Sequence, residues 1–347
     1  MESRVFGKTP EGSTVSLYTI QNKNGIKAEI INYGGIVVSL YMPDKNGKLD
    51  DIVLGFDDFD SYLSKNPFFG AITGRHANRI EDACFELNGK KYTLLKNDGK
   101  NHLHGGAKGF DKVLWEVVEH NDSLIKLFYR SADGEEGYPG NLDVTVTYVL
   151  TDNNEWLIDY KAVSDADTVI NLTNHTYFNL AGHGSGSIMD HRLKIDADKY
   201  TVNNEECIPT GEIKDVSGTI MDFRQGKAIK PEPQPGDHTL LFGGGYDHNF
   251  VLNEKSGGLE WIAELYDPKS GRKMDVYTTK PGVQLYTSNN LDGTITGKGG
   301  VRYCKWAGVC LETQFFPNAM KHKNFPSPVL KAGEQYNHIT IYKFGCR

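Results

Sequence analysis

The stretch Leu142–Ala162, LDVTVTYVL-TDNN-EWLIDYKA, decides the fold class of this chain. Apolar residues occupy every second position from Leu142 to Leu150 and again from Trp156 to Ala162, and polar residues fill most of the positions between them. Successive side chains of a strand point to opposite faces, so this period of two indicates two strands that each bury one face. The intervening TDNN segment is rich in turn-forming residues and predicts an antiparallel hairpin.

Short alternating runs of this kind recur along the chain, whereas long segments with helical period do not. Ile26–Ile31 and Ile36–Met42 flank an Asn-Tyr-Gly-Gly turn and predict a second hairpin. We expect one short helical turn over Phe56–Leu63 and a long surface loop over Pro231–Gly236. Further strands are predicted at Leu124–Arg130, Leu193–Ala197, Lys273–Thr279, Val283–Thr287, Val309–Phe316 and Ile339–Phe344. The pattern predicts an all-β, antiparallel fold, a large sandwich or barrel with few short helices, in a single domain spanning residues 1–347.

Composition and charge narrow the class of protein. The chain has 38 Lys plus Arg against 45 Asp plus Glu, which gives a net charge of −7. A mildly acidic surface argues against nucleic acid and against an anionic membrane as partners, and it is compatible with a small neutral ligand. No apolar window is long enough to predict a membrane-spanning helix, and the N-terminus lacks the apolar core of a signal peptide.

The five cysteines are scattered, and no CxxC motif occurs. An odd number at low density argues against a disulfide framework and against a zinc knuckle. We therefore expect a reducing compartment, and hence a cytoplasmic protein.

One polar stretch, Thr173–Leu180 (TNHTYFNL), places an imidazole among amides, hydroxyls and aromatic rings. If it forms a strand, His175 and Tyr177 share one face with Thr173 and Asn179. A histidine in such surroundings suits a proton donor to a polyhydroxylated ligand. The alternative is a core histidine whose hydrogen bonds are satisfied within the protein.

Two glycine-rich clusters precede it. In Gly70–Ile80 the side chains of Asn78 and Arg79 can hydrogen-bond vicinal hydroxyls, although a structural salt bridge of Arg79 is the alternative. This cluster lacks the Gly-Lys-Ser/Thr ending of a phosphate loop. In the second cluster His102 and His104 have the spacing of half a metal site, but no matching pair occurs elsewhere, so we expect no metal. His104 is then either a ligand-binding residue or a surface histidine at a turn.

Two carboxylates stand out in the C-terminal half. Asp247, in a Gly-rich aromatic loop, can accept hydrogen bonds from sugar hydroxyls, or it caps a turn. Glu312 lies in a largely apolar predicted strand. An unpaired glutamate buried there has a raised pKa, which suits a general base. A buried Glu–Arg pair is the alternative.

Taken together and in this order, these clusters resemble the aldose 1-epimerase (galactose mutarotase) family. The resemblance runs from near Tyr33 to near Tyr342. The matching segments are Gly74–Ile80, Leu103–Gly106, Gly109–Asp111, Asp133–Gly140, Asn174–Leu180, Tyr246–Phe250 and Glu312–Pro317.

The resemblance implies a large antiparallel β-sandwich that interconverts the α and β anomers of free aldohexoses such as galactose and glucose, without a metal or cofactor. It implies that Glu312 is the general base, that His175 is the general acid and that His104 is a second active-site histidine. The expected partner is a monosaccharide, and the protein is expected to be a monomer or homodimer. The expected sugar-binding residues are Asn78, Arg79 and Asp247, with Tyr177 and Tyr286 as aromatic walls.

This chemistry carries further expectations about the acid and the base. They should lie on opposite sides of the pyranose, with Glu312 deprotonated and His175 protonated near neutral pH. A nearby carboxylate such as Asp247 would help to keep the imidazole charged.

Three alternative functions remain open on the sequence. A hexose-6-phosphate 1-epimerase on the same fold needs cations around the phosphate, and Arg75 and Arg79 are the arginines near a site motif. A glycoside hydrolase needs two carboxylates, which Glu312 and Asp247 can supply, but it leaves His175 without a role. A non-catalytic sugar-binding protein is the alternative from another class.

Overall fold

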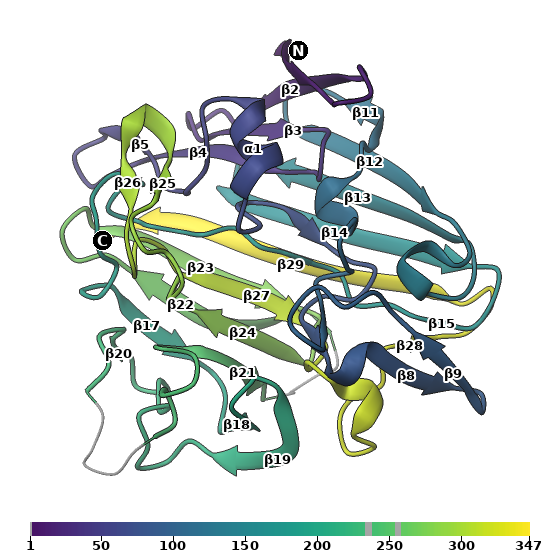
Figure 1. Ribbon diagram of the computed structural model, residues 1–347. Coiled ribbons are helices and arrows are strands. Elements are labelled where there is room, and N and C mark those ends of the chain that lie inside the picture. The colour runs from purple at the N-terminus through teal and green to yellow at the C-terminus, as the bar shows by residue number, and fades with distance from the viewer. Residues whose placement is uncertain (1, 233–237, 254–257) are drawn as a thin grey trace.

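The computed structural model describes residues 2–232, 238–253 and 258–347. Strands dominate it, and the described residues contain one α-helix, α1 (Phe59–Lys65) (Figure 1). This helix begins at Phe59 and not at the predicted Phe56, because the Asp58 side chain caps it by accepting a hydrogen bond from the main-chain N–H of Ser61 at 2.8 Å. Short 3₁₀ turns occur at Glu81–Ala83, Phe110–Lys112, Glu135–Gly137, Lys298–Gly300 and Ala319–Lys321.

The largest sheet has nine strands, and the predicted hairpin lies inside it. Leu142 pairs with Ser164 and Leu150 with Trp156, so the two alternating runs face each other along their whole length. The C-terminal strand, yellow in Figure 1, crosses the middle of this sheet. The order is β11 (Glu116–His120), β12 (Leu124–Ser131), β13 (Leu142–Leu150), β14 (Glu155–Ser164), β29 (Gln335–Cys346), β23 (Arg272–Thr278), β22 (Glu260–Tyr266), β17 (Arg192–Ile195), β20 (Lys227–Ala228).

Two five-stranded antiparallel sheets accompany it. The first contains the other predicted hairpin and has the order β1 (Glu2–Lys8), β2 (Thr14–Gln21), β3 (Lys27–Ile31), β4 (Val37–Pro43), β5 (Leu49–Asp51). The second has the order β19 (Pro209–Asp215), β18 (Lys199–Asn203), β21 (Asp247–Val251), β24 (Gly282–Tyr286), β27 (Cys310–Gln314).

Five two-stranded ladders complete the described part of the chain, and two of them hold residues of the polar clusters. The pairs are β6 (Ile72–Thr73) with β16 (Thr173–Asn174), β7 (Arg79–Ile80) with β10 (His102–Leu103), β8 (Cys84–Leu87) with β9 (Lys90–Thr93), β15 (Thr168–Val169) with β28 (Val329–Leu330), and β25 (Ile295–Thr296) with β26 (Arg302–Tyr303).

The main core shows why alternation predicted the class. Every second residue of β13 is buried, and these residues join one apolar cluster that extends from Ile20 to Phe344. The all-β sandwich prediction is thus confirmed. Residues 233–236 of the predicted Pro231–Gly236 loop lie outside the described residues. Within the described ranges, no helix is both long and apolar enough to cross a membrane.

Candidate active site

Three neighbouring strands, β21, β24 and β27, provide one wall of the site. Asn249 of β21 lies opposite Gln284 of β24, which lies opposite Glu312 of β27. Directly paired residues of antiparallel strands present their side chains on the same face, so these polar groups form one row. On the same strands the side chains of opposite orientation, such as Val283 and Leu311, belong to the apolar core. The register therefore places these polar side chains on one face of the sheet and the apolar core side chains on the other.

Glu312 lies at the β27 end of this row and is 2% exposed. Its Oε1 atom lies 3.5 Å from Nε2 of His175, and its Oε2 atom has no hydrogen-bond partner in the described residues. Burial raises the pKa of Glu312 well above its usual range, and the nearby Asp247 carboxylate adds to the effect. The alternative of a buried Glu–Arg pair is not found, because Arg79 pairs with Asp98 and Asp247 instead.

His175 follows a strand that ends earlier than predicted. The predicted strand over residues 173–180 is wrong beyond Asn174, because the Asn174 side-chain oxygen accepts a hydrogen bond from the Thr176 N–H and turns the chain there. The imidazole nevertheless lies beside Tyr177, with ring centroids 4.9 Å apart and planes at 20°. Phe68 stacks near its other side at 5.8 Å and 19°. Two aromatic rings thus hold the plane of the imidazole.

The predicted aromatic wall residue Tyr286 adjoins His175, whereas Asn179, from the predicted shared face, lies elsewhere. Tyr286 of β24 makes edge contacts with the rings of His175 at 6.2 Å and Tyr177 at 5.9 Å, so both predicted aromatic walls adjoin the imidazole. Asn179, in contrast, donates hydrogen bonds to the main-chain oxygens of Gly186 and Ala307 and supports a loop.

His104 is held against the site by the main chain of Asn78. The Asn78 N–H donates to Nδ1 of His104 at 3.2 Å, and the His104 N–H donates to the Asn78 carbonyl at 3.2 Å. The first bond makes Nδ1 an acceptor and leaves Nε2 as the protonated nitrogen of the neutral ring. Burial lowers the pKa of His104 well below its usual value, so the ring is neutral. The rings of His104 and His175 are 5.1 Å apart.

Arg79 connects the β7–β10 ladder to the strand wall. Its Nε donates to Asp98 at 2.9 Å, and its Nη1 lies 3.5 Å from Asp247. Asp247 also accepts a hydrogen bond from Gln284 Nε2 at 2.7 Å. Both charged side chains are about 15% exposed, so their remaining hydrogen-bonding capacity can face a ligand.

The protonation expected from the sequence is the reverse of what burial favours in this structure. Burial lowers the pKa of His175 to about 3 and raises the pKa of Glu312. Asp247 is not among the groups that raise the pKa of His175. Burial therefore disfavours the carboxylate–imidazolium pair and favours a neutral carboxyl beside a neutral imidazole.

The expected separation of acid and base also needs correction. At 3.5 Å, Glu312 and His175 cannot lie on opposite sides of a pyranose ring, and they must address neighbouring atoms of a ligand. His104 completes this group, since ligand atoms of all three residues lie within 4.8 Å of one another. Two imidazoles and a carboxylate can hold a metal ion, and these three are the described residues with that geometry.

Two predicted candidates point elsewhere. The buried Arg75 guanidinium donates to the main-chain oxygens of Pro139 and Gly140 and to Ser131, so it is a structural residue and cannot reach a phosphate at the site. His102 does not form a metal pair with His104. Its ring nitrogens bond to the Leu95 carbonyl and to the Tyr138 hydroxyl.

Three residues of the site were missed from the sequence, namely Phe68, Gln284 and Cys310. Gln284 could most easily have been found from the sequence, because it is a polar residue in the middle of an apolar strand segment. Cys310 precedes Glu312 by two positions and therefore shares its face. Nothing in the sequence pointed to Phe68, because it lies in a loop and the tertiary structure alone brings its ring into contact with His104 and His175.

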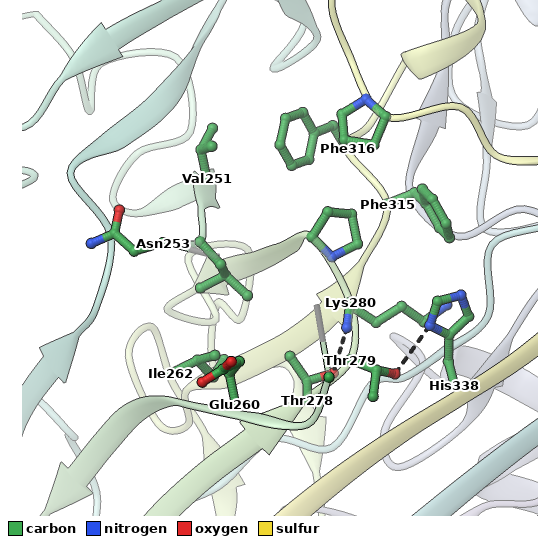
Figure 2. Close-up of a pocket in the computed structure, with 14 residues that line it drawn as sticks. Val251, Asn253, Glu260, Ile262, Thr278, Thr279, Lys280, Phe315, Phe316 and His338 are labelled. Carbon is green, nitrogen blue, oxygen red and sulfur yellow. Dashed lines mark hydrogen bonds between the residues drawn. The ribbon is translucent and has the colours of Figure 1, made fainter. Parts of the chain in front are cut away.

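A cavity of about 340 Å³ is lined by residues next to the ends of β24 and β27, such as Lys280 and Phe315, and by His338 of β29 (Figure 2). The Lys280 amine bonds to the Tyr336 hydroxyl, and Thr279 bonds to Nδ1 of His338. Burial lowers the pKa of Lys280 well below its usual value and that of His338 to about 3. Burial thus disfavours a positive charge on either group, which argues against a phosphate site in this cavity.

Comparisons with known proteins identify the family of the chain. A family model described as Aldose 1-epimerase matches residues 16–343. Galactose mutarotase from Bos taurus is 46% identical over 344 residues, which cover 98% of this chain and 97% of the relative. Aldose 1-epimerase from Escherichia coli is 37% identical over 337 residues, covering 96% of each chain.

Solved structures give the same result at the level of the fold. A GalM/aldose epimerase homologue from C. elegans superimposes with a TM-score of 0.88 at 33% identity, covering 95% of this chain and 98% of the other. Galactose 1-epimerase from Lactobacillus acidophilus gives a TM-score of 0.86 at 27% identity, covering 99% and 98%.

Proposed function

The chain belongs to the aldose 1-epimerase family, and we propose that Glu312 and His175 carry out the proton transfers of its reaction. The protein is an epimerase that interconverts the α and β anomers of aldoses. We propose free aldohexoses such as galactose and glucose as its substrates, because relatives named galactose mutarotase are up to 46% identical over nearly the whole chain.

The reaction needs two proton transfers and no redox change. A base takes the proton of the C1 hydroxyl while an acid protonates the ring oxygen O5, and the C1–O5 bond breaks to give the open-chain aldehyde. Rotation about C1–C2 presents the other face of the carbonyl. As the ring closes, the former base gives its proton to the aldehyde oxygen, and the former acid takes its proton back from the O5 hydroxyl. Each assisted transfer contributes roughly 10²–10⁴-fold to the rate.

The 3.5 Å separation of His175 Nε2 and Glu312 Oε1 is the observation that carries this assignment. The C1 hydroxyl and O5 are bonded to the same carbon, so their proton-transfer partners must also be close neighbours. The carboxylate of Glu312 on β27 and the imidazole of His175 just after β16 meet this requirement, with Glu312 directed at the C1 hydroxyl and His175 at O5.

The proton of the pair occupies a different residue at each stage. Carboxylate with imidazolium is the arrangement that opens the ring, and carboxylic acid with neutral imidazole is the arrangement that holds the aldehyde. Both contain one proton. Burial disfavours the first arrangement, so in this proposal a proton passes from Glu312 to His175 when the cyclic sugar binds.

The remaining site residues orient the sugar in this proposal. Arg79 and Asp247 offer donors and acceptors on either side of an ion pair, and Gln284 supports Asp247. His104 donates from Nε2 to a sugar oxygen, since its Nδ1 is occupied by Asn78. The faces of Tyr177 and Tyr286 pack against the apolar carbons of the ring.

Polarimetry of freshly dissolved α-D-galactose tests the assignment. The purified protein should accelerate the change in optical rotation, and Glu312→Gln should reduce this acceleration to near the spontaneous rate. Glu86→Gln, an exposed glutamate on β8, is the matched control and should match the unsubstituted protein. Full activity of Glu312→Gln would remove the proposed base.

The phosphorylated-sugar alternative is weaker on this structure. Arg75 is committed to main-chain oxygens, and Arg79 is engaged by two carboxylates. Glucose 6-phosphate should therefore compete poorly with galactose. We further propose that the protein works in the cytoplasm, because its five cysteines are all free.

A further inference from the structure

One strand of the site contacts both ring nitrogens of His175. Cys310 and Glu312 are two positions apart on β27 and share a face. Oε1 of Glu312 lies 3.5 Å from Nε2, and Sγ of Cys310 lies 3.5 Å from Nδ1. The thiol and the imidazole are both buried, at 0% and 4% exposure. The proposed reaction gives a role to Glu312 but gives none to the Cys310 thiol.

The chemistry at Nε2 places a requirement on Nδ1. If Nε2 gives a proton to the sugar and takes it back, Nε2 must be unprotonated in the neutral ring. A neutral imidazole carries one N–H, so that hydrogen must then reside on Nδ1. Without a suitable acceptor at Nδ1 the ring can shift to the opposite tautomer, in which Nε2 already carries a hydrogen and cannot act as the proton acceptor.

We propose that Cys310 is a positioning residue whose sulfur accepts the hydrogen bond of His175 Nδ1–H and thereby keeps Nε2 free for proton transfer. This inference rests on the proposed function, since it supplies the tautomer that the acid needs. The distance of 3.5 Å between His175 Nδ1 and Cys310 Sγ is compatible with a hydrogen bond, because sulfur is larger than oxygen.

A neutral thiol suits this role better than a carboxylate. Burial raises the pKa of Cys310 well above its usual value, so the sulfur stays uncharged. An uncharged acceptor fixes the tautomer without stabilising the imidazolium strongly, which leaves His175 a strong acid. The main-chain carbonyl of His175 also favours the protonated ring, and it accepts a hydrogen bond from Gly70 N–H at 3.0 Å.

Nuclear magnetic resonance of ¹⁵N-histidine-labelled protein tests the tautomer directly, with His175 assigned by the loss of its signals in His175→Gln. In the unsubstituted protein the neutral ring should carry its hydrogen on Nδ1. In Cys310→Ala a substantial fraction should move to Nε2, and kcat should fall by about three- to tenfold with KM within about twofold, as expected for loss of one modest hydrogen bond. Cys310→Ser, which keeps an acceptor, should restore most of the Nδ1–H form and of kcat.

Cys304→Ala, at an exposed cysteine, is the matched control and should change neither readout. A hydrogen on Nε2 in the unsubstituted protein, or an unchanged tautomer ratio in Cys310→Ala, would overturn the proposal. A drop in kcat without a tautomer shift would show a merely structural role and would also overturn it. The tautomer measurement needs no turnover, so it is independent of the mutarotation assay that decides the proposed function.

Discussion

The Nε2 atom of His175 lies 3.5 Å from Oε1 of Glu312, and both side chains are almost completely buried. Two groups of opposite acid–base character share a site from which water is largely excluded. Their protonation is therefore a property of the pair, since a charge on either one depends on the other to balance it. This relationship underlies the predictions for activity.

Removing either member of the pair should abolish enzymatic mutarotation while the fold persists. We expect Glu312→Gln and His175→Ala each to lower kcat by roughly 10²–10⁴-fold, the usual contribution of a general acid or base. Polarimetry gives the rate, and circular dichroism verifies the fold. The double variant should be little worse than either single one, because the two groups act as a unit. Additive losses would argue against a shared proton.

His104→Asn should have a smaller effect than either of those substitutions. The side chain binds and orients the sugar in this proposal, and an amide can still donate a hydrogen bond. We expect KM to rise by about tenfold, with kcat lowered less, in line with the loss of one hydrogen bond to a bound ligand. Progress curves at several galactose concentrations separate the two constants. A collapse of kcat at unchanged KM would make His104 a proton-transfer residue.

The pH dependence should be broad and asymmetric. The active pair holds one proton. A second proton adds only near the pKa of His175, which burial lowers to about 3, so kcat/KM should be flat through the mildly acidic range. The shared proton is lost as the pH rises through the raised pKa of Glu312, so activity should fall on the alkaline side. Initial rates in buffers of constant ionic strength, corrected for spontaneous mutarotation, give the profile. A fall in activity centred near the ordinary pKa of histidine would contradict it.

Chelation should leave the enzyme active, because the proposed proton transfers use protein groups alone. Dialysis against EDTA is expected to change kcat by less than the error of polarimetry. Added Zn²⁺ should inhibit, because His104, His175 and Glu312 place ligand atoms within 4.8 Å of one another and would be withdrawn from the sugar. EDTA should reverse that inhibition. Loss of activity on chelation alone would point to a metal-dependent reaction.

A buried ion pair away from the site offers a test of stability. Lys298 Nζ lies 2.5 Å from Asp51 Oδ2, and both side chains are about 7% exposed. Lys298→Met leaves Asp51 charged and unpaired, so the free energy of unfolding should fall by about 3–5 kcal/mol. Urea denaturation measures this difference. Lys269→Met is the control, since the Lys269–Asp190 pair is exposed and should contribute less than about 1 kcal/mol. Similar losses in both variants would refute the role of burial.

Much of the fold was predictable from local pattern. The alternation in Leu142–Leu150 and Glu155–Ala162 identified a hairpin that the structure confirms residue by residue. The Asn174 side-chain turn was not predicted, because it depends on one hydrogen bond and interrupts an otherwise strand-like segment. The site residues were identified from their residue types, and the structure gathers His104, His175 and Glu312 within a few ångströms. Their catalytic roles stay predictions.

By itself, the sequence determined the all-β class and the identity of the polar clusters, because side-chain alternation and residue chemistry are local properties. Only the tertiary structure decided that the Arg75 guanidinium is committed to main-chain oxygens, and that Glu312 lies 3.5 Å from His175 and not across a sugar ring from it. It also decided that burial disfavours the charged forms of Glu312 and His175. Those outcomes depend on burial and cross-strand register, which are set by residues far away in the chain.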